Sequence, residues 1–411
     1  MRHISVLGLG YVGLPTAAVF ADSGLRVVGV DIDRKTIETI SSGRAHIVEP
    51  GLDELLKKVV GNGSLRASTA VEESDVFVIA VPTPFKEGNA PDLKHVKAAA
   101  SMIAPFLKRG NLIILESTSP VGATEQLAAW LSEARSDLNV PKIDGSEGDI
   151  YLAYCPERVL PGKVLREVVE NDRVIGGITS KSSELAVQFY NNAVKGQCHV
   201  TNSRTAELCK LSENSFRDVN IAFANELSII SAKLGIDVYE LIALTNRHPR
   251  VNILQPGTGV GGHCIAVDPW FIVDGAPKEA RIIRTAREVN DDKPKWVIDQ
   301  IAALALGFDN PTVACMGLAY KPNVDDLRES PSIEVVKGLS DQDVGQILVC
   351  EPFVSELPES LKKRGLKNHD VESAVASADI IAFLTAHDQF HGTLQQLQPG
   401  KKIFDACGLS R

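Results

Sequence analysis

The chain has 411 residues, more than one hydrophobic core usually fills, so we expect two or three domains. Hydrophobic residues make up 44% of it and charged residues 23%, which is typical of a folded globular protein rather than a disordered one. The formal net charge of −9 argues against nucleic acid or an anionic membrane as the main partner. Any anionic ligand must therefore be held by local basic groups.

The N-terminal residues MRHISVLGLG run directly into a strand pattern, and no apolar stretch is long enough to span a bilayer. We therefore expect a cytoplasmic protein with no membrane partner. The seven cysteines are odd in number, scattered along the chain and never spaced as a metal-binding pair. We expect reduced thiols and predict no metal site.

The first part of the chain alternates apolar strands with helix-compatible segments. The strand ISVLGLG is followed by a glycine turn, a helical run to Ser23 and the strand LRVVGVDID. Further strands are predicted at VFVIAVPT, LIILEST and IYLAYC, and this alternation is typical of a parallel sheet covered by helices. We assign residues 1–200 to a Rossmann-like α/β domain.

The next segment reads as one long helical run over residues 201–235, with Thr or Asn available to cap it and Gly235 to end it. A second helical run follows at about residues 278–306. We assign residues 201–306 to a central helical domain whose apolar faces join two or more copies of the chain in a homodimer or larger homo-oligomer.

From Pro311 the alternation of strands and helices returns. The strand patterns are TVACMGLAYK, QILVCEP, DIIAFLT and KKIFDACG, with a helix-compatible SPSIEVVKGLS between the first two. Residues 307–411 are therefore predicted to form a second doubly wound, Rossmann-like domain, which lacks a GxGxxG and holds a nucleotide-like part of a ligand by other means. The expected fold is thus two Rossmann-like α/β domains joined by a central helical domain.

Gly8, Gly10 and Gly13 in GLGYVG lie between a predicted strand and a predicted helix, and Asp31 ends the next strand about 20 residues downstream. This spacing brings a pyrophosphate close to the helix N-terminus and lets the acid accept from a ribose hydroxyl. A carboxylate there repels a 2′-phosphate, so NAD is favoured over NADP, although Arg34 would soften that preference. The alternative is a tight turn with no cofactor.

Lys210, Asn214 and Arg217 share one stripe of the long predicted helix, at i, i+4 and i+7. Because the rest of that helix is largely apolar, these groups need partners, which a sugar nucleotide in a cleft would supply. The alternative is a solvated face or internal salt bridges.

Two loops follow predicted strands of the first sheet, ESTSPVG and CPERVLPG. Ligands bind at the carboxyl ends of parallel strands, so Glu116, Thr118, Glu157 and Arg158 are candidates. Carboxylates in loops are more often simply solvated, and Cys155 is interpreted as structural. Further on, RHPRVN gathers Arg247, His248 and Arg250, which indicates either an anion site or an exposed basic turn.

The stretch GTGVGGHCIAVDPW surrounds a single thiol, Cys264, with glycines. A thiol that attacks a carbonyl carbon needs the substrate within about 3–3.5 Å, and glycines remove the side chains that would block this approach. Backbone amides would stabilise an oxyanion, and a cation such as Lys210 near the thiol would raise its thiolate fraction. The alternative is a buried, inert cysteine beside a glycine bend.

Seven segments together resemble the UDP-glucose/GDP-mannose dehydrogenase superfamily over essentially the whole chain. They are GLGYVGLP, PTPF, ESTSPVG, CPERVLPG, KLSENSFRDVN, NRHPRVNILQPGTGVGGHCIAVDPW and LAYKPNVDDLRES. CPERVLPG, RHPRVNILQPG and HCIAVDPWF resemble the acetamido-sugar branch. UDP-glucose members usually carry Pro-Lys-Asp where this chain has Ala266, Val267 and Asp268.

The resemblance implies an NAD-dependent, two-step, four-electron oxidation of a sugar 6-hydroxymethyl group to an aldehyde and then a carboxylate. UDP-N-acetyl-D-mannosamine is the expected substrate, for surface polysaccharide synthesis. Cys264 is then the nucleophile, which forms a thiohemiacetal and later a thioester that water cleaves. Lys210, with Asn214 or Asp268 and an ordered water, would transfer protons or hold the oxyanion, and Glu157 is a candidate partner for the hydrolytic water.

The same resemblance implies two sets of ligand contacts. The glycine turn, Arg34 and Thr118 would contact NAD. The other expected NAD contacts are Tyr11, Val12, Asp31, Thr83, Thr124 and Arg328. The UDP-sugar would be contacted by Arg158, Val159, Lys210, Asn214, Arg217, His248, Arg250, Gly261, Tyr320 and Lys321, with His248 and Arg250 supplied by a second subunit.

One position departs from the family pattern. Close relatives carry a basic residue in a DAKG-like C-terminal motif, where this chain has Cys407. Either another cation such as Lys401 substitutes for it, or phosphate is held more weakly. Two further alternatives stay open, namely UDP-N-acetylglucosamine or UDP-glucose as the substrate, and a non-catalytic UDP-sugar or NAD sensor, which would have no need of Cys264.

Overall fold

The computed structural model describes residues 1–160, 162–394 and 400–409, and the chain forms two compact units. Unit 1 comprises Met1–Glu213 and Trp270–Ala276, and unit 2 comprises Asn214–Pro269 and Pro277–Arg411. Pro161 in the CPERVLPG segment lies outside the described residues, as do residues 395–399 and 410–411 of the last predicted domain.

Unit 1 contains an eight-stranded sheet in the order β3-β2-β1-β4-β5-β6-β7-β8. Its strands are β1 (His3–Leu7), β2 (Arg26–Val30), β3 (Leu65–Ser68), β4 (Val76–Ile79), β5 (Leu112–Leu115), β6 (Tyr151–Tyr154), β7 (Arg173–Gly177) and β8 (Cys198–Asn202). Neighbouring strands pair in parallel except β6 and β7, which are antiparallel.

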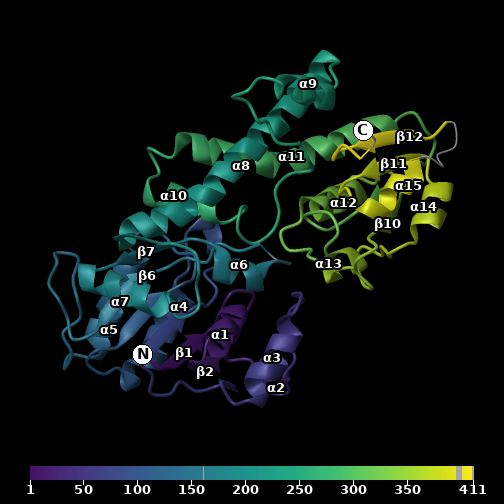
Figure 1. Cartoon of the computed structure of the whole chain (residues 1–411). Coiled ribbons are helices and arrows are strands. Elements are labelled where there is room, and N and C mark those ends of the chain that lie inside the picture. The colour runs from purple at the N-terminus through teal and green to yellow at the C-terminus, as the bar shows by residue number, and fades with distance from the viewer. Residues whose placement is uncertain (161, 395–399, 410–411) are drawn as a thin grey trace. The chain divides into compact units, whose positions relative to one another are not determined.

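Helices cover both faces of this sheet (Figure 1). On β4, Val76 and Val78 join one apolar core with α1 and α3, whereas Phe77 and Ile79 join a second core with α4 and α5. This burial of both faces confirms the doubly wound α/β prediction. The helices are α1 (Gly13–Asp22), α2 (Arg34–Ser41), α3 (Leu52–Gly61), α4 (Lys94–Ile103), α5 (Ala123–Ala134), α6 (Val164–Glu170) and α7 (Ser180–Tyr190), with short 3₁₀ turns η1 (Glu87–Asn89) and η2 (Ala104–Phe106).

The sequence did not predict β3, β7 and β8. β3 and β8 are the two edge strands of the sheet, and His199 and Val200 of β8 are exposed, so no continuous apolar run marks that strand. β7 ends in two glycines, which weaken a strand pattern. Its reversed direction beside β6 departs from the all-parallel sheet that the alternation indicated.

The long predicted helix is confirmed as α8 (Ser203–Leu234) (Figure 1). Asn202 caps its start, because the side-chain oxygen accepts from the backbone N–H of Thr205 at 2.9 Å. Gly235 follows its end with a φ of 68°, a left-handed conformation that suits glycine. The other central helices are α9 (Val238–Thr245), α10 (Asp268–Gly275) and α11 (Arg281–Ala305), and α11 confirms the second helical run.

Unit 2 contains a four-stranded, all-parallel sheet in the order β10-β9-β11-β12. On β9, Val313 and Cys315 pack in a core with α11 and α12, while Ala314 and Met316 pack in a core with α14 on the other face. The second Rossmann-like sheet is thereby confirmed. Its elements are β9 (Thr312–Met316), α12 (Pro331–Asp341), β10 (Gln346–Cys350), α13 (Glu359–Lys362), α14 (Val371–Ser377), β11 (Ile380–Phe383), η3 (Asp388–Phe390), α15 (His391–Leu394) and β12 (Lys402–Asp405).

Candidate active site

The glycine turn between β1 and α1 is shaped for close approach of a ligand. The N–H of Gly8 donates to the carbonyl of Val30 at 2.8 Å, which ties the turn to the end of β2. A Cβ at position 13 would lie 1.9 Å from the Gly8 carbonyl oxygen, so only glycine fits there. A Cβ at Gly10 would meet nothing within 4 Å, and this open backbone leaves room for a pyrophosphate at the start of α1.

Asp31 follows β2 and is oriented by the backbone. Its two carboxylate oxygens accept from the N–H of Leu9 at 2.9 Å and from the N–H of Asp33 at 3.0 Å. The acid is only partly buried, so it can still accept from the hydroxyls of a ribose. Arg34 lies three residues on, exposed at the first position of α2. The turn and the acid thus fit an NAD adenosine ribose and pyrophosphate.

The other residues predicted to contact NAD differ in accessibility. Tyr11 is exposed and Val12 is half-buried beside the open turn. Thr83 is buried and donates from its hydroxyl to the Thr118 carbonyl at 2.5 Å, so these two residues lie together after β4 and β5. Thr124 is fully buried at the start of α5, where its hydroxyl already has a protein acceptor.

That acceptor is Glu207 of α8, which the sequence analysis missed. Its carboxylate accepts from the N–H of Gly122 at 2.6 Å, from the N–H of Thr124 at 2.8 Å and from the hydroxyl of Thr124 at 2.6 Å. Burial raises the pKa of Glu207, while these three donors oppose the rise. The acid satisfies the first amides of α5 and joins that helix to α8 across 83 positions in sequence.

Glu116 and Glu157 lie together in a buried cluster around Arg173. Arg173 Nη1 is 2.8 Å from Glu157 Oε2 and 3.8 Å from Glu116 Oε1, and Tyr190 donates to Glu116 at 3.3 Å. Burial first, and then the Glu157 carboxylate, raises the pKa of Glu116 to about 8. Neither acid is a solvated loop carboxylate. Burial also raises the pKa of the neighbouring Cys155 to about 12, which agrees with a structural role.

Arg158, next in the chain, points elsewhere. Its guanidinium forms an ion pair of 2.7 Å with Glu213 on α8 and is about one-third exposed, while Val159 is half-buried. The pair fixes Arg158 beside the part of α8 that carries Lys210, which is itself half-buried. An anion that enters here would compete with Glu213 for the guanidinium.

The three residues of the predicted α8 stripe have different surroundings. Asn214 is buried and donates from its side-chain nitrogen to Asp268 Oδ2 at 2.5 Å, whereas Arg217 is exposed. Asp268 opens α10, and its N–H donates to the carbonyl of Cys264 at 2.9 Å. The structure therefore brings the nucleophile candidate, Asp268 and Asn214 together.

Cys264 is exposed and belongs to a loop anchored by buried amides. The N–H of Gly257 donates to Asn225 Oδ1 at 2.9 Å, and Asn225 in turn donates to Asn290 Oδ1 at 2.9 Å. Asn290 donates to Asp218 Oδ1 at 2.8 Å. These side chains come from α8 and α11 and are almost completely buried. Their hydrogen bonds therefore fix the backbone of the glycine-rich loop at Gly257. The sequence analysis missed all three.

The loop after β9 carries two predicted substrate residues, Tyr320 and Lys321. Both are half-buried, and the Lys321 ammonium is 5.9 Å from the centre of the Tyr320 ring. Burial first, and then the Asp326 carboxylate, raises the pKa of Tyr320. Arg328 pairs with Asp326 at 2.6 Å in this same loop, while Gly261 packs directly against Tyr320.

The RHPRVN turn is exposed, which agrees with its interpretation as an exposed basic turn. Asn246 closes it, because its side chain donates to the carbonyl of Ile253 at 2.9 Å and accepts from that residue's N–H at 2.7 Å. His248 and Arg250 project from the closed turn into solvent. Both side chains are therefore accessible from outside the turn.

Cys407, the position that departs from the family pattern, is half-buried. Burial and the Asp405 carboxylate raise the pKa of this thiol, which lies 3.6 Å from the Phe383 carbonyl oxygen. The Lys401 ammonium donates to the carbonyls of Ala376 at 2.9 Å and Ala378 at 2.6 Å, at the end of α14. Lys401 is thus hydrogen-bonded to backbone carbonyls at the end of α14.

Three family models match successive parts of the chain. They are the NAD binding domain, the central domain and the UDP binding domain of the UDP-glucose/GDP-mannose dehydrogenase family, over residues 2–194, 204–292 and 314–410. The chain belongs to this family. It is therefore an NAD-dependent dehydrogenase that acts on a UDP-sugar, which confirms the predicted family, enzyme class and cofactor. None of the described helices is both long and apolar enough to cross a membrane.

Proteins with more specific names are similar over nearly their whole length. The chain is 57% identical to the NDP-N-acetyl-D-galactosaminuronic acid dehydrogenase of Ralstonia nicotianae, covering 99% of this chain and 96% of that protein. It is also 57% identical to the UDP-N-acetyl-D-mannosamine dehydrogenase of Campylobacter jejuni, covering 95% and 96%. The solved structure of a UDP-D-ManNAc dehydrogenase from Pyrococcus horikoshii matches with a TM-score of 0.89 at 39% identity, covering 99% and 96%.

Proposed function

We propose that this enzyme oxidises UDP-N-acetyl-D-mannosamine to UDP-N-acetyl-D-mannosaminuronate, consuming two NAD for each sugar. The observation that carries the proposal is the near full-length similarity to a UDP-N-acetyl-D-mannosamine dehydrogenase. The accessible Cys264 beside the Asn214–Asp268 pair supports the second oxidation. The equal identity to the Ralstonia protein favours one competing substrate, the N-acetylgalactosamine sugar, which differs from N-acetylmannosamine at C2 and C4.

The open turn at Gly10 and the oriented Asp31 carboxylate would hold NAD, with Tyr11, Val12, Thr83, Thr118 and Arg328 as further contacts. Arg34 and Thr124 complete the set that we assign to the cofactor. When bound, NAD accepts one hydride from the sugar carbon in each of the two oxidations. The chain's own residues must therefore position that carbon and manage the protons.

Cys264 supplies the covalent step. Its sulfur adds to the aldehyde carbon, the C=O π electrons move to oxygen, and a thiohemiacetal forms. Loss of hydride from that carbon leaves a thioester, and water then cleaves the C–S bond to give the carboxylate and restore the thiol. The glycines before Cys264 leave room for this approach.

Lys210, Asn214, Asp268 and Glu157 are the proposed proton-handling groups. The 2.5 Å hydrogen bond from Asn214 orients Asp268, whose N–H is tied to the Cys264 carbonyl. Lys210 is assigned to the developing oxyanion or to proton transfer through an ordered water. Glu157, held by Arg173, is assigned to the hydrolytic water.

The UDP-sugar contacts assigned to this chain are Arg158, Val159, Lys210, Asn214, Arg217, Gly261, Tyr320 and Lys321. We assign His248 and Arg250 to the site of a second subunit, because the closed, exposed turn presents both side chains outward. An apolar stripe on α8 supports the dimer. Phe216, Phe223, Ile230 and Leu234 recur near heptad spacing and are 71%, 52%, 44% and 64% exposed.

We further propose a division into an NAD-binding domain at residues 1–200, a central domain at 201–306 and a UDP-sugar-binding domain at 307–411. The ranges of the three family models support this division. A cytoplasmic location and service to a surface polysaccharide pathway are proposed with it.

A substrate panel tests the proposal. Purified enzyme is given NAD and one of four UDP-sugars, those of N-acetylmannosamine, N-acetylgalactosamine, N-acetylglucosamine and glucose, and kcat/KM is measured for each. We expect the mannosamine sugar to exceed the others by at least a hundredfold. The highest kcat/KM with N-acetylgalactosamine would favour the competing substrate, and no turnover with any sugar would refute the proposal.

Cys264→Ala tests the covalent step, with Cys198→Ala, a partly exposed cysteine of β8, as the matched control. The Cys264 variant should bind the sugar and NAD but form no uronate, whereas the Cys198 variant should match the wild type. Full uronate production by Cys264→Ala would contradict the mechanism.

A further inference from the structure

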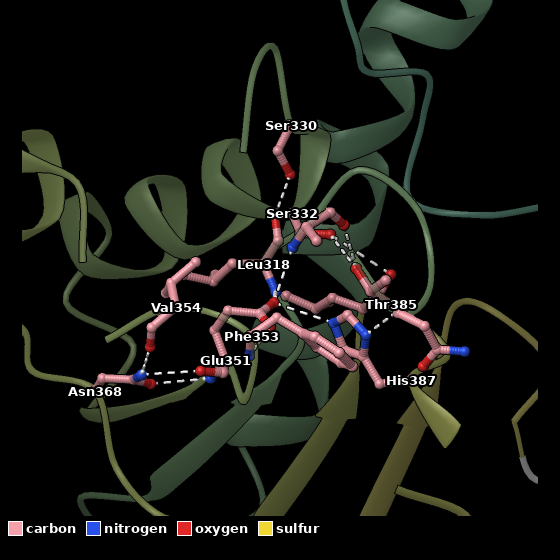
Figure 2. A network of polar contacts seen from close by, with 12 residues as sticks. Leu318, Ser330, Ser332, Glu351, Phe353, Val354, Asn368, Thr385 and His387 are labelled. Carbon is pink, nitrogen blue, oxygen red and sulfur yellow. Dashed lines mark hydrogen bonds and ion pairs between the residues drawn. The ribbon is translucent and has the colours of Figure 1, made fainter. Parts of the chain in front are cut away.

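A buried acid and a buried imidazole meet at the carboxyl end of the unit 2 sheet. Glu351 directly follows β10, His387 follows β11, and both side chains are fully buried. Figure 2 shows Glu351 at the centre of a network in which it faces His387 and the start of the loop after β9. We call these two residues the Glu351–His387 clamp.

Glu351 holds the start of that loop. Its Oε2 atom accepts from the N–H of Leu318 at 2.6 Å, from the N–H of Ala319 at 2.9 Å and from His387 Nε2 at 3.0 Å. Its other oxygen accepts from the N–H of Phe353 at 2.9 Å. Hydrogen bonds from His387, Phe353 and Leu318 lower the pKa of Glu351 against the opposing effect of burial, so the carboxylate stays charged.

His387 holds the far end of the same loop segment. The N–H of Asn323 donates to His387 Nδ1 at 2.9 Å, which requires an unprotonated Nδ1 and leaves the ring proton on Nε2, facing Glu351. Asn323 has a φ of 60°, a conformation that needs local support, and its side-chain oxygen accepts from the N–H of Asp388 at 3.0 Å. The neutral imidazole thus connects the carboxylate to the end of the segment.

The Glu351–His387 clamp therefore holds residues 318–323 at both ends, and the three residues between the held positions include Tyr320 and Lys321. Two hydroxyl groups add hydrogen bonds at the start of this segment. Thr385 donates to the Ala319 carbonyl at 2.7 Å, and Ser330 donates to the Leu318 carbonyl at 2.5 Å (Figure 2). The position of Tyr320 is consequently set by buried, charge-assisted hydrogen bonds.

Residues 318–323 also limit the path of the loop that carries Cys264. A Cβ at Gly261 would lie 2.7 Å from the Tyr320 Cβ and 2.6 Å from the Glu329 carbonyl oxygen, so the two backbones are in direct contact. The N–H of Gly262 donates to the Arg328 carbonyl at 3.0 Å. A displaced Tyr320 would shift the backbone two to three residues before Cys264.

We propose that Glu351 and His387 are positioning residues for the reaction. They fix Tyr320 and Lys321 for the UDP-sugar and, through Gly261 and Gly262, fix the loop that carries the nucleophile. Neither residue touches the reacting atoms. The inference rests on the proposed function for its catalytic part, whereas its effect on UDP affinity depends only on the UDP-binding domain.

Paired substitutions separate the two hydrogen bonds of His387, to Glu351 and from Asn323. In His387→Gln, the amide reaches the position of Nε2, so the donor to Glu351 is kept and the acceptor for Asn323 is lost. In His387→Asn, the amide oxygen replaces Nδ1, so the acceptor is kept and the donor is lost. Glu351→Gln removes the charge, and His391→Gln, an exposed histidine of the same domain, is the matched control.

The measurements are UDP affinity by calorimetric titration, and kcat and KM for the UDP-sugar and for NAD. We expect the dissociation constant of UDP and the sugar KM to rise at least tenfold in both His387 variants, with kcat reduced and the NAD KM within twofold of wild type. His387→Asn should be the milder variant, because it keeps the Asn323 amide satisfied. The His391 control should be unchanged.

The proposal is overturned if the His387 variants fold and keep the UDP affinity and kcat of the wild type, since a purely structural role would lower only the melting temperature. If Glu351→Gln does not fold, the two His387 variants decide the question. If the wild-type enzyme binds UDP but oxidises none of the sugars, the proposed function fails, and the UDP affinities still judge the clamp.

Discussion

Lys293 of α11 is a buried amine whose burial should cost stability in a pH-dependent way. It is 2% exposed, donates to the Ser228 hydroxyl at 2.5 Å and lies 3.8 Å from the centre of the Trp296 ring. Burial alone lowers its pKa from 10.5 to about 7. Each pKa unit corresponds to about 1.4 kcal/mol, so this displacement makes burial of the charged amine cost about 5 kcal/mol.

Lys293→Met fills a similar volume without the charge. The variant loses one hydrogen bond and one cation–π contact, together worth about 2–3 kcal/mol, so at pH 7 it should be more stable than the wild type by about 2 kcal/mol. The sign of the pH effect follows from the lowered pKa. Between pH 7 and 10.5 the unfolded lysine binds a proton that the folded one releases, so wild-type stability rises with pH.

Urea unfolding at pH 7 and pH 9 measures this difference. The advantage of Lys293→Met should shrink by about 2–3 kcal/mol between the two pH values, at about 1.4 kcal/mol per pH unit. Lys295→Met, an exposed lysine of the same helix, should show no such trend. A Lys293→Met difference that is constant with pH would refute the reasoning.

Three further changes test other parts of the account. Glu207→Ala should lower the free energy of unfolding by about 3 kcal/mol, because three donors, two of them buried, lose their acceptor. Glu125→Ala in the same α5 turn should lower it by less than about 1 kcal/mol, and urea midpoints compare the two variants. Asn225→Ala frees the Gly257 amide and should lower kcat about tenfold without changing the NAD KM, as steady-state rates would show. The pKa of Glu116 is raised to about 8, so this group contributes stability below pH 4.5 that is lost as the pH rises through 8. The urea midpoint of Glu116→Gln should therefore rise relative to that of the wild type between pH 6 and pH 9.

Features set by neighbouring residues were predictable from the sequence. The glycine turn, Asp31 at the end of β2 and the Asn202 cap of α8 each depend on a few positions with fixed spacing. The glycines before Cys264 favoured an approachable thiol over a buried one, and the thiol is exposed. Local chemistry therefore sufficed to predict these features.

Features that join distant segments were not predictable in the same way. Glu207 reaches Thr124 from 83 positions away, and nothing near Glu207 distinguishes it from a solvated acid on a helix. Helical spacing put Asn214 and Arg217 on one stripe, yet packing buries the first against Asp268 and leaves the second exposed. The spacing of residues along a helix fixes the direction in which each side chain leaves the helix axis. Tertiary packing decides which of these side chains are buried.

The central claim is a four-electron oxidation through Cys264, and the NADH yield from a limiting amount of UDP-N-acetyl-D-mannosamine tests it most directly. Absorbance at completion should correspond to two NADH for each sugar, because the thiohemiacetal allows a second hydride to leave. A yield of one NADH would mean that oxidation stops at the aldehyde. That result would contradict the role assigned to Cys264.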